Sequence, residues 1–224
     1  MQTHYKINEL FQTIQGEGSY TGTPSIFLRL QGCPVGCAWC DTKHTWEVKA
    51  EMKQRAQDII VKTEDTETWF DASVEDILAL FNKEGYTAKH VVITGGEPAM
   101  YDLVPLTKML HEAGYSTQIE TSGTFDIQVD NDTWVTVSPK VNMKGGYKVL
   151  PEAMLRANEI KHPVAMEKHI DELDQLLKLG IQAGCLVYLQ PISQQARATK
   201  LAIDTCIARN WRLSLQTHKY LGIQ

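Results

Sequence analysis

Short runs of apolar residues alternate with amphipathic segments along most of the chain. The short runs predict strands, most of them buried, which we place at residues 25–30, 90–94, 116–121, 134–138, 185–189 and 212–216. Between them, apolar residues recur at the spacing of one helix face, which predicts helices near residues 73–85, 103–110, 167–179 and 196–209. Because right-handed crossovers place such helices outside, the alternation predicts an α/β fold with a mostly parallel, curved sheet.

Glycines and polar residues follow the expected strands at their carboxyl ends. Gly95-Gly96 follows residues 90–94, Ser138 ends the run at 134–138, and His218 follows the last strand. In parallel α/β sheets these ends meet at one edge, where ligands bind. Each sign also has an ordinary explanation, because a Gly-Gly pair can be a plain turn and a lone His is more often structural. Together they predict a site along that edge.

One segment breaks the alternation. Residues 47–72 are rich in Lys, Glu, Asp, Gln and Thr and show little apolar periodicity, so we expect a solvated insertion there. The remaining pattern needs no second domain. A chain of 224 residues that is 43% hydrophobic can build one sizeable core, which predicts a single domain over residues 1–224.

Composition narrows the classes of partner. A formal net charge of −5 argues against a nucleic-acid surface or an anionic membrane, and favours a small-molecule substrate. The first residues lack the apolar core of a signal peptide and no later run approaches membrane-spanning length, so we expect a cytoplasmic protein. Cys185 and Cys206 lie far apart and are interpreted as inert core thiols rather than a disulfide framework.

The strongest chemical signal is a loop with three cysteines, Cys33, Cys37 and Cys40. Thiolates this close repel one another unless a cation neutralises them, and iron-sulfur clusters use such short spacings. Three ligands would leave one coordination place open. Zinc is the alternative, because His44 could complete a Cys₃His set, but structural zinc normally takes its ligands from two separated pairs. Packing alone explains three grouped thiols least well.

Two further features ahead of this loop have open interpretations. Residues 11–18 contain two glycines, and either form a plain turn or let Gln15 and Glu17 donate or accept hydrogen bonds at a ligand. Arg29 lies in an apolar strand, where a guanidinium needs an anionic partner. That partner is either a carboxylate of the protein or a carboxylate of the substrate, which Arg binds through two parallel hydrogen bonds. We expect the substrate.

The motifs together resemble a known family. The C-x-x-x-C-x-x-C spacing, with Gly95-Gly96-Glu97-Pro98, resembles the radical S-adenosylmethionine (SAM) superfamily. The segment 11–18, the pair Asp41-Thr42 and the segment 216–220 narrow the resemblance to 7-carboxy-7-deazaguanine synthases. The resemblance implies a partial TIM-like barrel and a lyase of queuosine biosynthesis. It implies a radical ring contraction of 6-carboxy-5,6,7,8-tetrahydropterin to 7-carboxy-7-deazaguanine, with loss of ammonia.

The same resemblance implies roles for individual residues. A [4Fe-4S] cluster would be held by Cys33, Cys37 and Cys40, and Mg²⁺ by Thr42. The expected SAM contacts are Trp39, Cys40, Asp41, Gly96, Ser138, Pro139, Lys140 and Gln190. The expected substrate contacts are Ile14, Gln15, Gly16, Glu17, Arg29, Thr94, His218 and the last residue, Gln224.

The resemblance also implies partners: a homodimer and a flavodoxin-type reductant. One alternative is a glycyl-radical activating enzyme, which has the same cysteine spacing but acts on a protein glycine; Asp41, Thr42 and His218 disfavour it. The other is a zinc-stabilised binding module that uses His44 as the fourth ligand. Bound iron and sulfide would indicate an enzyme, and zinc alone a binding module.

Overall fold

Nine strands form one sheet in the order β3-β1-β2-β4-β5-β6-β7-β8-β9 in this computed structural model. The structure describes residues 3–192 and 195–223. The strands are β1 (His4–Ile14), β2 (Pro24–Leu30), β3 (Phe70–Ser73), β4 (His90–Gly95), β5 (Ser116–Thr121), β6 (Trp134–Val137), β7 (Glu159–Val164), β8 (Leu186–Pro191) and β9 (Arg212–Leu213). The helices are α1 (Ala56–Ile60), α2 (Val74–Lys83), α3 (Val104–Glu112), α4 (Pro151–Arg156), α5 (Glu167–Leu177), α6 (Ala196–Arg209) and α7 (Thr217–Leu221).

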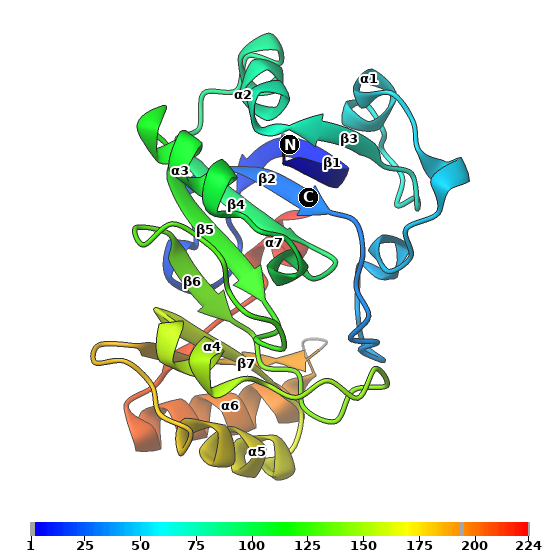
Figure 1. The fold of residues 1–224 in the computed structure, drawn as a ribbon. Helices are drawn as coiled ribbons and strands as arrows, with labels where there is room; N and C mark the ends of the chain where they lie inside the picture. Colours follow the sequence, from blue (N-terminus) through cyan, green and yellow to red (C-terminus); the bar gives the residue numbers. More distant parts are fainter. Residues whose placement is uncertain (1–2, 193–194, 224) are drawn as a thin grey trace.

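The sheet is mostly parallel and curved. Strands β2 and β4 to β9 pair in parallel, whereas β1 pairs antiparallel with both β2 and β3. Helices α2 to α6 lie along the outside of the curve, and α7 lies on its inner side (Figure 1). Within the described residues β3 and β9 do not pair, so the barrel stays open. This architecture confirms the predicted partial TIM-like barrel with outer helices.

The two faces of the parallel strands differ in chemistry. On β5, Ile119 is fully buried and belongs to the apolar core, whereas its neighbours Gln118 and Glu120 join a polar network. On β7, Ile160 packs in the same core, while Lys161 joins the polar network. Since side chains alternate along a strand, one face of the sheet packs the helices and the other presents hydrogen-bonding groups. The inner face of the barrel can therefore take a polar ligand.

Most predicted elements are present, and the differences have local causes. The helix predicted from residue 73 begins after Ser73, whose side chain forms a capping box with Asp76. The last predicted strand is much shorter than expected and covers only β9. The sequence pattern missed β1, β3 and β7. In β7, the charged residues Glu159 and Lys161 interrupt the apolar positions. Because the predicted strands were short apolar runs, the pattern did not identify this one.

The segment 47–72 is anchored to the sheet rather than wholly solvated, which corrects the prediction in part. Ile59, Trp69 and Phe70 are each at most 5% exposed, and β3 at the end of the segment pairs with β1. The side-chain amide of Asn8 donates hydrogen bonds to the carbonyl oxygens of Thr66 and Thr68 at 2.9 and 3.0 Å. The polar composition of the segment concealed these anchors, because only a few residues of the segment are buried.

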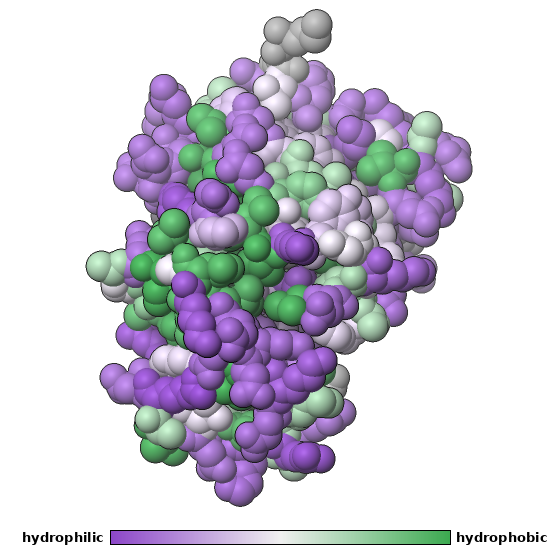
Figure 2. Space-filling view, turned by 60° about the horizontal axis from the view of Figure 1, so that its bottom comes forward, coloured by the Kyte–Doolittle hydropathy of each residue, from purple (hydrophilic) through white to green (hydrophobic). Residues whose placement is uncertain are grey.

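Of the described helices, none has both the length and the apolar character needed to span a bilayer. The face shown in Figure 2 is mostly hydrophilic, with its largest group of apolar side chains left of the centre and smaller groups elsewhere.

Candidate active site

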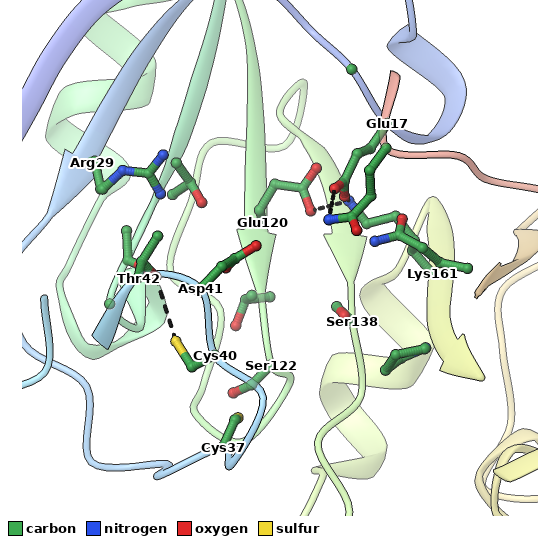
Figure 3. A pocket seen from close by; sticks show the side chains of 18 of the residues that line it. Glu17, Arg29, Cys37, Cys40, Asp41, Thr42, Glu120, Ser122, Ser138 and Lys161 are labelled. Carbon is green, nitrogen blue, oxygen red and sulfur yellow. Dashed lines mark hydrogen bonds and ion pairs between the residues drawn. The ribbon is translucent and has the colours of Figure 1, made fainter. Parts of the chain in front are cut away.

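A pocket of about 360 Å³ opens at the carboxyl ends of the parallel strands, within the size range of roughly 300–1,000 Å³ typical of ligand sites. Its wall combines the three-cysteine loop, the ends of β2, β4 and β5, and the segment around α7 (Figure 3). Among the predicted site residues it contains Ile14, Gln15, Gly16, Glu17, Arg29, Cys33, Cys37, Trp39, Cys40, Asp41, Thr42, Thr94, Gly96, Ser138, Lys140, Gln190 and His218. Pro139 is buried outside the lining, and Gln224 lies outside the described residues.

The cysteine loop is held by backbone hydrogen bonds rather than by regular structure. The backbone N of Gly32 donates to Thr45 O at 2.7 Å, and that of Cys33 donates to Trp46 O at 2.9 Å. On the other side, Gly145 N donates to Val35 O at 3.0 Å. These bonds fix the loop at both ends, so that its three thiols face one pocket.

The spacing of the thiols fits a cluster better than a single zinc ion. Four ligands at 2.3 Å around one zinc would place sulfur atoms about 3.8 Å apart. Among the described residues, the groups whose ligand atoms all lie within 4.8 Å of one another do not include the three cysteines. His44 is turned away, with Nε2 at 3.5 Å from Glu9 Oε1. This arrangement does not favour the Cys₃His alternative, and the donor set suits the three thiolates of a [4Fe-4S] cluster.

The electrostatics of the loop disfavour thiolates unless a cation is bound. Burial, with smaller contributions from Glu97 and the other two thiols, raises the pKa of the Cys33 thiol to about 11. Burial likewise raises the pKa of Cys37, although Lys140 opposes this shift. Three thiolates in this position would be unfavourable in the chain alone, and a bound cluster would supply the missing positive charge.

The Gly95-Gly96 turn allows β4 to approach the start of the cysteine loop. A Cβ on Gly96 would lie 2.1 Å from Gly32 O, and Gly95 has φ of +123°. Only glycine fits both positions. The turn also places Glu97, which is 2% exposed and accepts hydrogen bonds from Thr121 Oγ1 at 2.5 Å and Ser122 N at 2.9 Å. Glu97 thus ties the end of β4 to the end of β5.

The expected SAM contacts lie beside the cysteine loop. Trp39 is 44% exposed, which leaves its ring face accessible at the pocket mouth. Lys140 Nζ donates hydrogen bonds to Ser138 O at 2.8 Å and Ser138 Oγ at 2.6 Å, and burial lowers the pKa of Lys140. Gln190 Oε1 accepts a hydrogen bond from Ser214 Oγ at 3.0 Å. These groups form a polar rim to which a nucleoside and an amino acid could bind.

Thr42 is placed where a hard cation could use its hydroxyl. Its Oγ1 lies 3.5 Å from Gly95 O and 3.6 Å from Cys40 Sγ, both long contacts (Figure 3). Since Mg²⁺ takes oxygen ligands at 2.0–2.1 Å and keeps several waters, one hydroxyl with weak protein contacts is a suitable ligand.

Arg29 has a protein partner, contrary to the prediction that it binds only a substrate anion. Its Nε lies 2.5 Å from Glu9 Oε2, on the neighbouring strand β1. Although burial raises the pKa of Glu9, His44 and Arg29 more than offset it and lower that pKa to about 2. In the described part of the chain the guanidinium bonds through Nε alone. Its terminal nitrogens, in the pocket wall, remain able to bind a carboxylate.

Opposite the cysteine loop, the inner wall holds three charges that touch one another. Lys161 Nζ donates hydrogen bonds to Glu17 Oε2 at 2.6 Å and to Glu120 Oε2 at 2.7 Å (Figure 3). Sequence reasoning named Glu17 but missed Glu120, Lys161 and Glu97. A charged residue inside an otherwise strand-like run was the available signal for Glu120. Lys161 had none, because its strand was not predicted.

The C-terminal segment closes the pocket against residues 15–17. Thr217 N donates to Gly16 O at 3.0 Å, and Gln216 Nε2 donates to Glu17 Oε1 at 2.9 Å. A Cβ on Gly16 would lie 2.5 Å from His218 Nδ1, so glycine is needed there. Burial lowers the pKa of His218, which favours the neutral ring. The structure thus brings together two predicted site segments that are about 200 residues apart.

Comparisons with known proteins agree with this geometry. The Radical SAM superfamily matches residues 28–138. The 7-carboxy-7-deazaguanine synthase of Escherichia coli (strain K12) is 60% identical over 220 residues, covering 98% of this chain and 99% of the relative. The synthase of Buchnera aphidicola subsp. Schizaphis graminum is 50% identical over 99% of this chain and 100% of the relative. The crystal structure of QueE from Escherichia coli has a TM-score of 0.93 and 58% identity, covering 95% of this chain and 94% of that chain. This chain belongs to the 7-carboxy-7-deazaguanine synthase family, within the radical SAM superfamily.

Proposed function

We propose that this protein is a carbon-nitrogen lyase that converts 6-carboxy-5,6,7,8-tetrahydropterin to 7-carboxy-7-deazaguanine, with loss of ammonia, for queuosine biosynthesis. The observation that carries the proposal is a single pocket that joins the three cysteines, the Gly95-Gly96 turn and the Arg29 guanidinium. Its relatives named as this synthase match nearly the whole chain.

Membership of the radical SAM superfamily implies a [4Fe-4S] cluster and SAM. When bound, these cofactors supply one-electron, radical chemistry. Cys33, Cys37 and Cys40 would hold the cluster. SAM would be held by the polar rim of the pocket, with the contacts Trp39, Cys40, Asp41, Gly96, Ser138, Pro139, Lys140 and Gln190.

The substrate carboxylate would be bound by Arg29 and by Mg²⁺ on Thr42. The terminal nitrogens of Arg29 suit a planar carboxylate, and its bond to Glu9 through Nε holds the guanidinium in one orientation. Support for Mg²⁺ comes from the weakly engaged Thr42 hydroxyl on the same pocket wall. Neutralising the carboxylate in a pocket shielded from water would orient the pterin ring toward the cysteine loop.

The pterin ring would be bound by the polar residues on the inner side of the pocket. Ile14, Thr94 and His218 offer one apolar surface and two hydrogen-bonding groups. Gln15 and Glu17 add an amide and a carboxylate that can pair with the amine and amide edge of a pterin. Gly16 allows the close approach of the C-terminal segment that closes this side. The terminal Gln224 remains a proposed contact.

We also propose a homodimer, a flavodoxin-type reductant and a cytoplasmic location. Large apolar side chains on α6 and α7 support a subunit contact, because Ile207 is 78% exposed and Leu221 65% exposed. All five cysteines are free, as expected in a reducing compartment. Light scattering on the purified protein tests the dimer.

Anaerobic incubation of reconstituted protein with reductant, SAM, Mg²⁺ and the carboxytetrahydropterin tests the reaction. We expect mass analysis to detect 7-carboxy-7-deazaguanine and ammonia. A protein that cleaves SAM only with a glycine-containing protein partner would instead be an activating enzyme. Bound zinc without sulfide would contradict the radical SAM proposal altogether.

A further inference from the structure

Two of the three buried charges on the inner wall, Glu120 and Lys161, have no role in the proposed binding of substrate and cofactors. The side chain of Lys161 is 5% exposed, that of Glu17 16% and that of Glu120 15%. All three line the pocket, and Figure 3 shows Lys161 between the two carboxylates. A buried ion group costs desolvation free energy, so its place on a pocket wall favours a chemical role.

The two carboxylates are not equivalent. Glu17 also accepts a hydrogen bond from Gln216, and Lys161 outweighs the effect of burial, so the pKa of Glu17 is lowered. For Glu120 burial dominates, Lys161 only partly opposes it, and repulsion from Glu17 and Glu159 adds to it, so its pKa is raised. One ammonium group thus serves two carboxylates, and Glu120 is the one that can hold a proton near neutral pH.

The groups that face Glu120 come from several elements. Gln118, on the same strand, donates from Nε2 to Glu120 Oε1 at 3.0 Å. Strand β7 supplies Lys161 and Glu159, the loop after β1 supplies Glu17, and the segment after β6 supplies the buried ammonium of Lys140. Of these groups, Lys161 is the only charged one that donates a hydrogen bond to Glu120. Lys161 therefore positions this carboxyl and limits how strongly it holds a proton.

The proposed reaction needs a proton carrier in the pocket. The nitrogen that leaves the tetrahydropterin ring carries one hydrogen in the substrate and three as ammonia, while two hydrogens leave ring carbons. The ring contraction carries one of these two hydrogens to the nitrogen, which becomes an amino group, and the elimination step carries the second. In the elimination step a C–H pair becomes a ring double bond and the C–N pair leaves with nitrogen. One proton must then move from carbon to nitrogen. This transfer balances atoms and electrons without a further oxidant or reductant.

We propose that Glu120, held by Lys161, carries this proton from the ring carbon to the departing nitrogen. The inference rests on the proposed function and adds a catalytic residue to it. Glu120 in its ionised form accepts the proton, and in its protonated form donates it. Lys161 acts as a positioning residue, and Glu17 keeps Lys161 in place.

The main test compares Glu120→Gln with Glu159→Gln. Glu159 is fully buried in the same barrel interior but does not line the pocket, so its variant removes a similar charge away from the substrate. For reconstituted Glu120→Gln we expect normal iron content and substrate affinity within threefold of wild type. Product formation should fall by about two to four powers of ten, the usual contribution of a general acid-base group. Glu159→Gln should retain most of the product formation, with its pH profile displaced to lower pH, because loss of the repulsion from Glu159 lowers the pKa of Glu120.

A second readout separates proton transfer from the radical step. Glu120→Gln should still cleave SAM in the presence of substrate, while ammonia release is lost. Product formation within tenfold of wild type, or a loss confined to KM, would contradict the proposal. If wild-type protein makes no 7-carboxy-7-deazaguanine, the proposed function itself fails, which is a different result.

A measurement on wild-type protein covers the case in which Glu120→Gln does not fold. Infrared difference spectra across the neutral pH range should show the carbonyl band of a protonated carboxyl group disappearing as pH rises. In Glu120→Asp this band should move in frequency and titrate at a different pH. A band that is the same in both proteins, or that is absent from wild type, would assign no mobile proton to Glu120 and overturn the proposal.

Discussion

The two walls of the pocket solve the problem of buried charge in opposite ways. The cysteine loop presents Cys33, Cys37 and Cys40 with Lys140 as a nearby cation that offsets them only in part, and burial raises the pKa of two of these thiols. The inner wall pairs Lys161 with two carboxylates within 2.7 Å. The first wall is completed by a bound cofactor, whereas the second is complete within the chain. Substitutions on the first should remove activity and spare the fold, while substitutions on the second should affect both.

The largest effect should follow Cys37→Ala. Loss of one of three thiolates should abolish cluster binding and all SAM cleavage, because no other described cysteine lies in the pocket. The thermal unfolding of the chain without iron should change little. Iron and sulfide analysis with calorimetry measures both. An unchanged cluster content would remove Cys37 from the ligand set.

Lys161→Met should destabilise the protein by about 3–5 kcal/mol, because Glu17 and Glu120 lose their only shared cation while they stay buried. Denaturant unfolding at neutral pH gives this value. The double variant Lys161→Met with Glu17→Gln should recover part of the loss, since one uncompensated carboxylate is removed. If Lys161→Met unfolds like wild type, the inner wall is not held together by this ion group.

Arg29→Lys tests a residue that can serve both the fold and the substrate, since Arg29 pairs with Glu9 and also lines the pocket. Stability should be largely kept, because an ammonium can still pair with Glu9. Substrate affinity and turnover should fall by roughly two to three powers of ten, because a point charge cannot form two parallel hydrogen bonds. Arg29→Ala should lose both. Near-normal affinity with a large drop in melting temperature would assign Arg29 to the fold alone.

Acid unfolding should report on Glu9. Its pKa is lowered from 4.5 to about 2 in the folded protein. The stability from its ionised form is therefore present above pH 4.5 and is lost as the pH falls toward about 2. The ionised Glu9 contributes about 3 kcal/mol to the free energy of unfolding, because each unit of pKa difference corresponds to 1.36 kcal/mol. The stability of Glu9→Gln, measured by denaturant unfolding, should depend less on pH there. Parallel pH profiles for the two proteins would contradict this.

The smallest effect should come from Thr42→Val, which removes one hydroxyl and keeps the shape of the side chain. The cluster spectrum and the fold should be unchanged, while the Mg²⁺ concentration needed for half-maximal turnover should rise about tenfold or more, because tenfold is the lower end of what the loss of even an outer-shell partner of a metal ligand costs. A matched control is Thr45→Val, whose hydroxyl donates to Thr42 O at 2.8 Å outside the pocket lining. An equal Mg²⁺ response in both variants would place the ion elsewhere.

Local sequence pattern was sufficient for much of this protein. The spacing of Cys33, Cys37 and Cys40 is chemistry within one loop, and Gly95-Gly96 marks a turn through its missing side chains. Apolar runs such as residues 90–94 report burial of a strand wherever that strand lies in the sheet. These signals depend on neighbours in sequence, which is why they predicted the parallel sheet, the cluster loop and the edge that carries the site.

The tertiary structure alone decided which charges meet. Arg29 pairs with Glu9 through the register of two antiparallel strands, and Lys161 reaches Glu120 across 41 residues of sequence. His44 follows the cysteines closely in sequence but faces Glu9. A charge in a strand shows that a partner must exist, since an unpaired buried charge is costly, but not which residue it is. Strand order and register, set by packing of the whole sheet, make that choice.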